Sequence, residues 1–241
     1  MRAATATLLG ALVVAAAASA APEPRPEASR AVPRIEQMVV FRDGRADTSR
    51  ARPRAKRARV GGGFCRVAAR TPLALLVRSR PGRLRLRDDF GSCPESAAGV
   101  YVVGIGPDAE GRLGAGGWVY KVGRRAATAG AGDPSGPYGR GRLRKGQRVL
   151  WFYCRRAGGC QRTLAVRVSA GEGGEVTVRV TGHDDNGRGV AVEAAAVKIG
   201  PLELRTDAQG RASATLAPGR YGVVATKDGL VRSFRERVRV R

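Results

Sequence analysis

Short apolar runs separated by turn-forming residues constrain the fold of this chain more than any other feature. Each run is rich in β-branched or aromatic side chains and is bounded by Gly, Pro or Asp, and the chain contains 34 Gly and 13 Pro. Turn sequences such as Asp185-Asn186-Gly187 and Asp207-Ala208-Gln209-Gly210 follow one another at short spacing. Short strands with regularly spaced turns are typical of all-β sandwiches. The sequence therefore predicts a mainly β fold.

The predicted strands fall into two regions, with a boundary near Gly171. In the first region they are Gln37–Phe41, Ala58–Val60, Arg83–Arg87, Val100–Ile105, Gly117–Val122, Arg148–Tyr153 and Thr163–Val168. In the second region they are Glu175–Thr181, Val190–Ile199, Leu202–Thr206, Ala212–Leu216, Gly219–Thr226 and Phe234–Val240. Residues 42–60 are basic and poor in apolar side chains, which predicts a long exposed loop that ends in a strand.

One helix is predicted in the first region. Thr71 is a suitable N-cap, and Pro72 suits the first helical position. Leu73, Leu76 and Val77 would share one helix face, and Pro81-Gly82 would end the helix. An α+β first domain is therefore expected, followed by an all-β second domain.

The N-terminus has the pattern of a secretory signal peptide. Arg2 precedes an apolar stretch from Leu8 to Ala18, and Ala18-Ser19-Ala20 provides small residues for cleavage. An uncleaved anchor is the alternative, but the stretch is shorter than the span of about 20 residues that a bilayer requires. We expect a signal peptide at 1–20, a proline-rich linker at 21–34, and domains at 35–170 and 172–241. No transmembrane segment is expected in the mature chain.

Export determines how the four cysteines are interpreted. Four thiols in an oxidising compartment predict two disulfides, for which three connectivities exist. We favour Cys65–Cys93 and Cys154–Cys160, because the five residues between the second pair form a flexible loop that can close on itself. The spacing C-x-x-C of many zinc sites is absent, and no metal or other cofactor is expected.

Positive charge is concentrated in the first part of the chain. The formal net charge is +24, and residues 172–241 contribute only +3 of it, from twelve basic and nine acidic side chains. A basic stretch is the candidate contact for a polyanion, and its members are Arg50, Arg52, Arg54, Lys56, Arg57 and Arg59. Because no aromatic side chains alternate with these cations, specific nucleic-acid recognition is not expected. The alternative is a solvated loop whose charge reflects composition.

Four aromatic residues form a second candidate site. Trp118 and Tyr120 share one strand face, as do Trp151 and Tyr153. They would form either a ligand platform for a sugar or a corrin-like ring, or the core of a small sheet, and we favour the core. The segment from His183 to Asn186 could bind a cation, but a plain turn is favoured because the spacing of a calcium loop is absent.

Sequence segments in each region also match the pattern of a known family. In the first region these segments are Cys65 with the Thr71–Val77 helix, Gly116–Gly123 and Leu143–Tyr153. With them the region resembles the small domain of unknown function also found at the C-terminus of transcobalamin, which implies a β-grasp-like fold of one helix on a mixed sheet and an exported binding module. In the second region the segments are Gly189–Val197, Thr206–Ala212, Leu216–Tyr221 and Lys227–Gly229. With them the region resembles the carboxypeptidase regulatory-like, transthyretin-type β-sandwich (Ig-like), which implies a spacer or adhesion unit.

These observations predict a non-enzymatic, exported bacterial surface or binding module. Its expected partner is an anionic polymer of the cell envelope or a surface protein. The alternative is a carrier that holds a hydrophobic or corrinoid-like small molecule on the aromatic sheet. A hydrolase is a weaker alternative, because the single His would have to serve a nucleophile that no G-x-S-x-G motif identifies.

Overall fold

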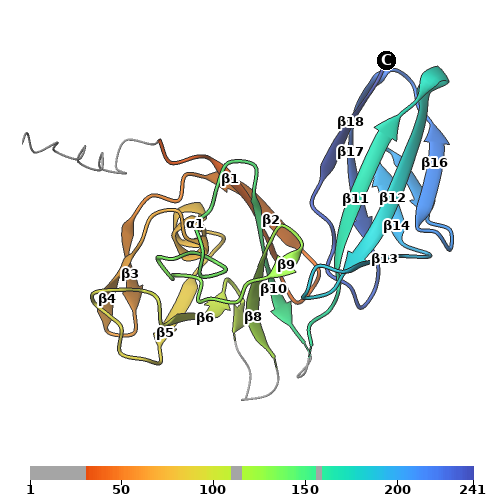
Figure 1. Cartoon of the computed structure of the whole chain (residues 1–241). Coiled ribbons are helices and arrows are strands. Elements are labelled where there is room, and N and C mark those ends of the chain that lie inside the picture. Colours follow the sequence, from red (N-terminus) through yellow and green to blue (C-terminus); the bar gives the residue numbers. More distant parts are fainter. Residues whose placement is uncertain (1–30, 110–115, 156–158) are drawn as a thin grey trace, which may run out of the picture. The chain divides into compact units, whose positions relative to one another are not determined.

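The computed structural model describes residues 31–109, 116–155 and 159–241 (Figure 1). The expected signal peptide and most of the expected linker lie outside these residues. Residues 32–241 form one compact unit, in which strands predominate and α1 (Pro72–Ser79) is the one α-helix of the described ranges. The predicted mainly β fold is therefore confirmed. In the same ranges no helix has the length and apolar character needed to cross a bilayer.

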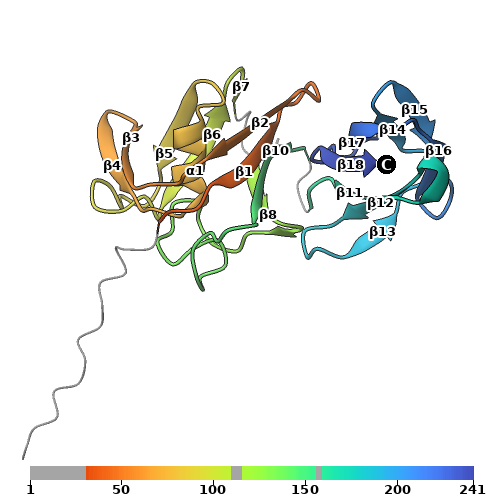
Figure 2. The ribbon, with the colours of Figure 1, turned by 90° about the horizontal axis from the view of Figure 1, so that it is seen from above.

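The N-terminal region is organised around a five-stranded mixed sheet with the order β2-β1-β10-β8-β9. Its strands are β1 (Ile35–Val40), β2 (Ala46–Ala51), β8 (Gly117–Val122), β9 (Arg125–Ala126) and β10 (Arg148–Cys154). Strands β1 and β10 are parallel, and the other pairs are antiparallel. Two small antiparallel sheets accompany this sheet (Figure 2). They consist of β3 (Lys56–Val60) with β4 (Gly63–Val67), and of β5 (Leu84–Asp88), β6 (Val100–Ile105) and β7 (Asp108–Ala109).

Helix α1 begins and ends as the sequence predicts. The Thr71 hydroxyl accepts a hydrogen bond from the Ala74 amide at 3.2 Å, which satisfies one free donor of the first turn. Arg80 ends the helix in the left-handed conformation, with a φ of 53°. Leu73 and Leu76 are fully buried in the same core as Trp151 of the sheet. The helix thus covers one face of the five-stranded sheet.

The other face of this sheet is also covered. Met38 and Val40 of β1 and Phe152 of β10 are buried on it together with Val231, which lies 79 residues beyond Phe152 in the chain. Strands that are buried on both faces are almost continuously apolar, and this explains the runs in β1 and β10. The segment that follows β17 therefore packs against the N-terminal sheet.

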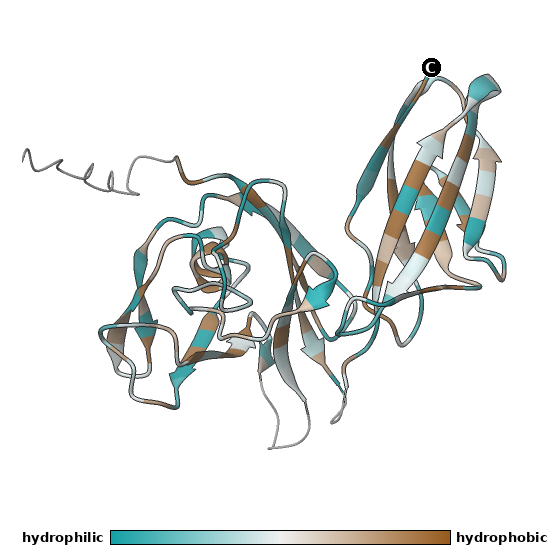
Figure 3. Cartoon of the chain, in the orientation of Figure 1, coloured by the Kyte–Doolittle hydropathy of each residue, from teal (hydrophilic) through white to brown (hydrophobic). Residues whose placement is uncertain are grey.

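The C-terminal region contains two antiparallel sheets that share one core. The first consists of β11 (Thr163–Ala170), β12 (Glu175–His183), β13 (Gly189–Ala191) and β16 (Arg211–Thr215). The second has the order β15-β14-β17-β18 and consists of β14 (Ala196–Ile199), β15 (Leu202–Arg205), β17 (Gly219–Thr226) and β18 (Glu236–Val240). Val176 and Val178 of the first sheet and Val197 and Val223 of the second are fully buried in this core. Apolar and polar residues alternate along β11 and β12, as Figure 3 shows.

The prediction of a long exposed loop at residues 42–60 is wrong. Ala46–Ala51 forms β2, which pairs with β1, and Lys56–Val60 forms β3 in full. Strand β2 lies at the edge of its sheet and none of its residues is buried, so its sequence has no apolar run. Polar and charged residues are typical of edge strands, which must not pair with other chains.

Two further boundaries differ from those predicted. The single strand expected at Val190–Ile199 is divided into β13 and β14, because Ala194 has a φ of 53°. The Thr206 hydroxyl stabilises the backbone between β13 and β14. It accepts a hydrogen bond from the Ala195 amide at 2.9 Å and donates one to the Val192 carbonyl at 2.6 Å. Strand β11, which the sequence placed in the first region, pairs with β12 along its whole length and contributes Leu164 to the C-terminal core.

Candidate functional site

Both predicted disulfides are present in the structure. Cys65–Cys93 links β4 to the segment between β5 and β6, and Cys154–Cys160 closes the short loop after β10. Neither bridge leaves a free thiol, because the chain has four cysteines and all four are paired. These residues therefore stabilise the N-terminal region and supply no reactive sulfur.

The six cations of the predicted basic stretch do not form one surface. Arg52 donates to the carbonyl of Val32 at 2.9 Å. Arg57 lies on the β3–β4 hairpin with its guanidinium 5.5 Å from the centre of the Phe64 ring. Arg59 lies on the exposed side of the same hairpin, and Arg54 is exposed on the connection before it, next to the half-buried Lys56. Only Arg50, on β2, joins cations from other parts of the chain.

Arg50 lines a hollow of about 620 Å³ that we call the arginine groove. Its wall on one side comes from β1, β2 and β10, and on the other from β17 and the segment that leads into β18. Five arginines and two glutamates line it, and they are Arg50, Arg148, Arg232, Arg235, Arg237, Glu36 and Glu236. Its net charge is therefore strongly positive.

Arg148 forms ion pairs with both glutamates of the groove. Its Nε lies 2.8 Å from a Glu36 oxygen, and its two terminal nitrogens bind the two carboxylate oxygens of Glu236. The hydrogen bond to Glu236 raises the pKa of Arg148. Arg50 makes only a longer contact with Glu36, at 3.5 Å. The acidic side chains of the groove therefore neutralise Arg148 and leave the other arginines largely uncompensated.

Three arginines of the groove form no ion pair with any residue in the described ranges. Arg235 and Arg237 are exposed, and Arg232 is half-buried with a buried Nε that has no hydrogen-bond partner in this part of the chain. Gly222 on β17 makes room for Arg235, because a Cβ at this glycine would lie 3.1 Å from the Arg235 Cδ. The long stem of Arg235 therefore lies across the sheet, and its charged end remains free for a ligand.

Positive side chains continue from the groove over the outer face of the β15-β14-β17-β18 sheet. Lys198, Arg232 and Arg235 line a second hollow on this face, together with Glu203, which is directly opposite Lys198. Arg220 and Arg239 are directly opposite each other on β17 and β18 and line a third. The groove is thus one end of an extended cationic surface.

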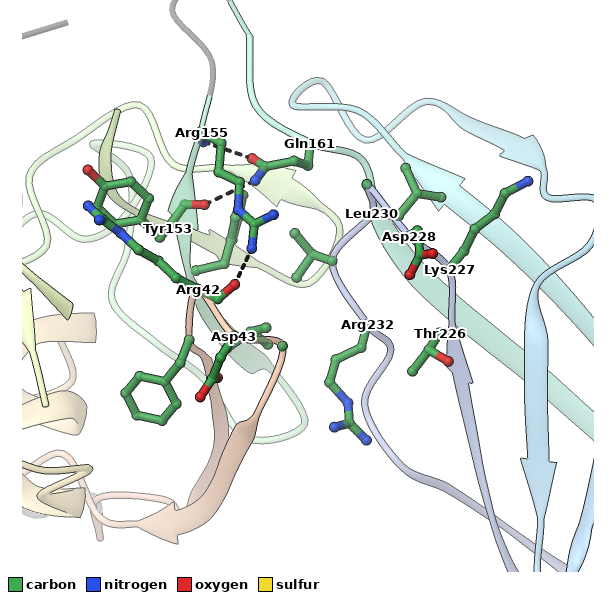
Figure 4. A pocket seen from close by; sticks show the side chains of 16 residues that line it. Arg42, Asp43, Tyr153, Arg155, Gln161, Thr226, Lys227, Asp228, Leu230 and Arg232 are labelled. Atoms are coloured by element: carbon green, nitrogen blue, oxygen red, sulfur yellow. Dashed lines mark hydrogen bonds between the residues drawn. The ribbon is translucent and has the colours of Figure 1, made fainter. Parts of the chain in front are cut away.

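A smaller cleft of about 280 Å³ adjoins the groove at Arg232 (Figure 4). Two of its three arginines, Arg42 and Arg155, are engaged within the protein. The Arg42 guanidinium stacks 3.7 Å from the centre of the Tyr153 ring, and Arg155 donates to the Arg42 carbonyl. The Gln161 side-chain oxygen accepts a hydrogen bond from the backbone amide of Arg155, directly after β10, at 3.1 Å. These interactions make the cleft a junction between chain segments, and Arg232, which it shares with the groove, is its one arginine without a partner in the described ranges.

The four aromatic residues lie where the sequence places them. Trp118 is opposite Tyr153 and Tyr120 is opposite Trp151, with ring centres 6.1 Å and 5.0 Å apart. All four side chains are buried, and burial raises the pKa of Tyr120 strongly. The Tyr120 hydroxyl donates to the Ala129 carbonyl at 2.7 Å. The quartet therefore belongs to the N-terminal core, as favoured above.

A hollow of about 500 Å³ nevertheless touches one side of the quartet. Trp118, Tyr120 and Trp151 contribute to its lining, and Phe90 and Tyr101 lie beside it with exposed fractions of 72% and 47%. The indole nitrogen of Trp151 is buried without a hydrogen-bond partner in the described ranges. A buried donor without an acceptor is unfavourable.

The hairpin after β12 uses its polar residues internally. The His183 ring is hydrogen-bonded to the Thr181 hydroxyl at 2.9 Å and to the Gly187 carbonyl at 3.0 Å. Burial lowers the pKa of His183. Asp185 pairs with the buried Lys121 of β8 at 3.2 Å. Within the described ranges no group of three or more His, Cys, Asp or Glu side chains could hold a metal ion. The structure therefore gives no support to cation binding by this hairpin.

Comparisons with protein-family models, curated proteins and solved structures give no match. The two family resemblances therefore remain predictions. Sequence inspection missed Arg148, Arg232, Arg235 and Arg237, because they are far from Arg50 in the chain. The one local signal was the arginine at every second position in Arg235–Arg241, which places these cations on one face of a strand.

Proposed function

We propose that this protein is an exported, non-enzymatic module that binds an anionic polymer of the cell envelope in the arginine groove. One observation carries the proposal: Arg232, Arg235 and Arg237 face the groove without acidic partners, while Arg148 occupies both glutamates. Arg232 is half-buried, and a partly buried cation without a counter-charge is costly, so a bound anion would remove this cost. The two disulfides support export, because such bridges persist in oxidising compartments.

The groove suits an extended ligand with repeated acidic groups. Guanidinium groups bind carboxylate, phosphate and sulfate oxygens through two parallel hydrogen bonds. The cationic surface extends from Arg50 at one end to Arg239 at the other, along a sheet face that also carries the small residues Gly222 and Val224. A polymer segment would contact several guanidinium groups at once, whereas a single small anion would contact one or two.

The test is binding of the mature chain to polyphosphate and polygalacturonate, with neutral dextran as the control polymer. We expect saturable binding to the two polyanions, no binding to dextran, and a steep loss of affinity between about 50 and 200 mM salt because counterions are released on association. Saturable binding to dextran, or affinity for polyanions that does not change with salt, would refute the proposal.

A pair of matched variants locates the contact. Arg235→Gln/Arg237→Gln removes two charges from the groove, and Arg57→Gln/Arg59→Gln removes two from the exposed β3–β4 hairpin. We expect the groove variant to lose about tenfold or more in affinity, since each lost phosphate contact removes one released counterion. The hairpin variant should lose much less. Equal losses would show that only net charge matters and that the groove has no special role.

A second candidate function is the binding of a small apolar molecule in the hollow beside Trp118, Tyr120 and Trp151. The exposed Phe90 and Tyr101 favour it, because large exposed aromatic side chains mark interaction sites. The unpartnered indole N–H of Trp151 favours a ligand that carries an acceptor. A hydrophobic or corrinoid-like ligand meets these requirements.

Tryptophan fluorescence tests this candidate directly, because Trp118 and Trp151 are the two tryptophans of the chain and both line the hollow. The neutral apolar dye N-phenyl-1-naphthylamine and a corrinoid are suitable probes that avoid the arginines. Saturable quenching is expected, and Tyr101→Ser should weaken it. The absence of a saturable change with either probe would count against a carrier function.

A further inference from the structure

Three arginines lie in a row across the first sheet of the C-terminal region. Arg167 on β11 is directly opposite Arg179 on β12, and Arg179 is directly opposite Arg211 on β16. All three are exposed, because they alternate with the buried residues Val166, Val178 and Ala212. Neighbouring strands are about 4.8 Å apart, so the row places three positive charges on a short line across the sheet. We call it the arginine row.

One acidic side chain lies next to the row: an Asp207 carboxylate oxygen accepts a hydrogen bond from the backbone amide of Arg211 at 2.7 Å. The next outward-facing row consists of hydroxyl residues, Ser169, Thr177 and Ser213, and the last two have their oxygens 3.4 Å apart. None of the three arginines forms an ion pair with a residue that the structure describes. The nearest acidic side chain on β12 is Glu175, two outward-facing positions beyond Arg179.

This arrangement is unfavourable for the fold alone. Like charges directly opposite each other on adjacent strands reduce stability, and here the repulsion occurs twice in succession. Guanidinium groups beside hydroxyl donors form instead a flat surface for a ligand with several anionic groups.

The arginine row and the arginine groove lie on opposite sides of the C-terminal region. The groove continues into the second hollow, which lies on the outer face of the β15-β14-β17-β18 sheet and is lined by Lys198 and Val224. The row lies on the outer face of the β11-β12-β16 sheet. The two sheets pack through their inner faces in one core, so their outer faces point away from each other (Figure 2).

We propose that the arginine row is a second anion-binding surface, and that the protein bridges two anionic polymer chains by binding one in the groove and one on the row. This inference rests on the proposed function of the groove. Two surfaces that face in opposite directions are poorly placed for one short polymer segment, and they are well placed to join two chains. Linked sites of this kind produce networks whose formation depends on both surfaces.

The test is light scattering of the full mature chain mixed with polygalacturonate of defined length, with binding measured in parallel. Wild-type protein should raise the scattering strongly as the protein-to-polymer ratio increases. The row variant Arg167→Gln/Arg179→Gln/Arg211→Gln should still bind through the groove, and should lose the rise in scattering. A control variant removes the same charge from the exposed β3–β4 hairpin, namely Arg57→Gln/Arg59→Gln/Arg66→Gln, and should retain the rise.

The outcomes separate the two proposals. If wild-type protein does not bind polygalacturonate, the proposed function of the groove fails. If wild-type protein binds and the row variant still raises the scattering as wild type does, the bridging inference alone is overturned. An equal loss in the row and control variants also overturns it, because net charge would then explain the network. Circular dichroism establishes that each variant is folded.

Discussion

The buried lysine of the N-terminal sheet allows a quantitative prediction about stability. Lys121 on β8 has a fully buried side chain, and its ammonium group lies 3.2 Å from an Asp185 carboxylate oxygen. It also donates to the carbonyl oxygens of Asp184 at 2.9 Å and of His183 at 3.3 Å. Burial lowers the pKa of Lys121, and the ion pair with Asp185 opposes this shift. Lys121 thus joins the N-terminal sheet to the hairpin after β12.

The two partners of this ion pair should respond unequally to substitution. Asp185→Ala leaves a buried ammonium group with two neutral carbonyls, and an unpaired buried charge costs about 3–5 kcal/mol of unfolding free energy. Lys121→Met keeps the apolar stem and removes the charge. The remaining Asp185 side chain is 37% exposed and can be hydrated, so the loss of hydrogen bonds should cost only about 1–2 kcal/mol. The double variant should resemble Lys121→Met, since no buried charge remains.

Urea unfolding, followed by the fluorescence of Trp118 and Trp151, measures these differences. The reasoning is refuted if Lys121→Met destabilises as much as Asp185→Ala, or if the double variant shows the sum of both losses. The pH dependence provides a second check. The folded state loses the Lys121 proton at lower pH than the unfolded state, whose pKa is near 10.5. Stability should therefore gain a contribution as pH rises from the lowered pKa toward 10.5, and Lys121→Met should abolish it.

Three other predictions concern the disulfides, the histidine and the arginine row. The Cys65–Cys93 bridge spans 28 residues and the Cys154–Cys160 bridge spans 6, so loop entropy predicts losses of about 3.6 and about 2.2 kcal/mol when each pair is replaced by alanine; the reverse order of the urea midpoints would contradict this. His183 is the single histidine, so its NMR titration is unambiguous and should give a pKa below 6.5. Because the unfolded state then takes up the proton first, His183 should reduce stability as pH falls through 6.5, and a normal titration would disprove its burial effect. The row variant should melt at a higher temperature than wild type at low salt, since like-charge repulsion is removed; a lower melting temperature would mean that the row stabilises the fold.

The helix and the disulfides show what local sequence can predict. Thr71 and Pro72 encode the start of α1 through side-chain and φ preferences that depend only on neighbouring residues. The pairing of Cys154 with Cys160 follows from proximity in the chain. The alternation of apolar and polar side chains predicted most strands, because a strand with one buried face has an apolar residue at every second position.

The polar edge strand β2 shows where this approach fails. Its six residues contain no apolar run, because β1 supplies the hydrogen-bonding partner and neither face of β2 is buried. Strand β11 was assigned to the wrong side of the boundary for a related reason. The apolar residues of β11 indicate that one of its faces is buried. They do not indicate that β12 is the strand with which it pairs.

The sequence by itself determined the mainly β class, the helix and its ends, and the positions of the aromatic quartet. The tertiary structure alone decided which charges meet. Arg50 lies more than 180 residues before Arg235, and the arginine row joins side chains from three strands through pairing register. Register and packing depend on contacts between distant segments, and these have no local signature. Net charge misled for the same reason: the C-terminal region carries only +3, yet pairing register brings several of its arginines side by side on the outer faces of its sheets.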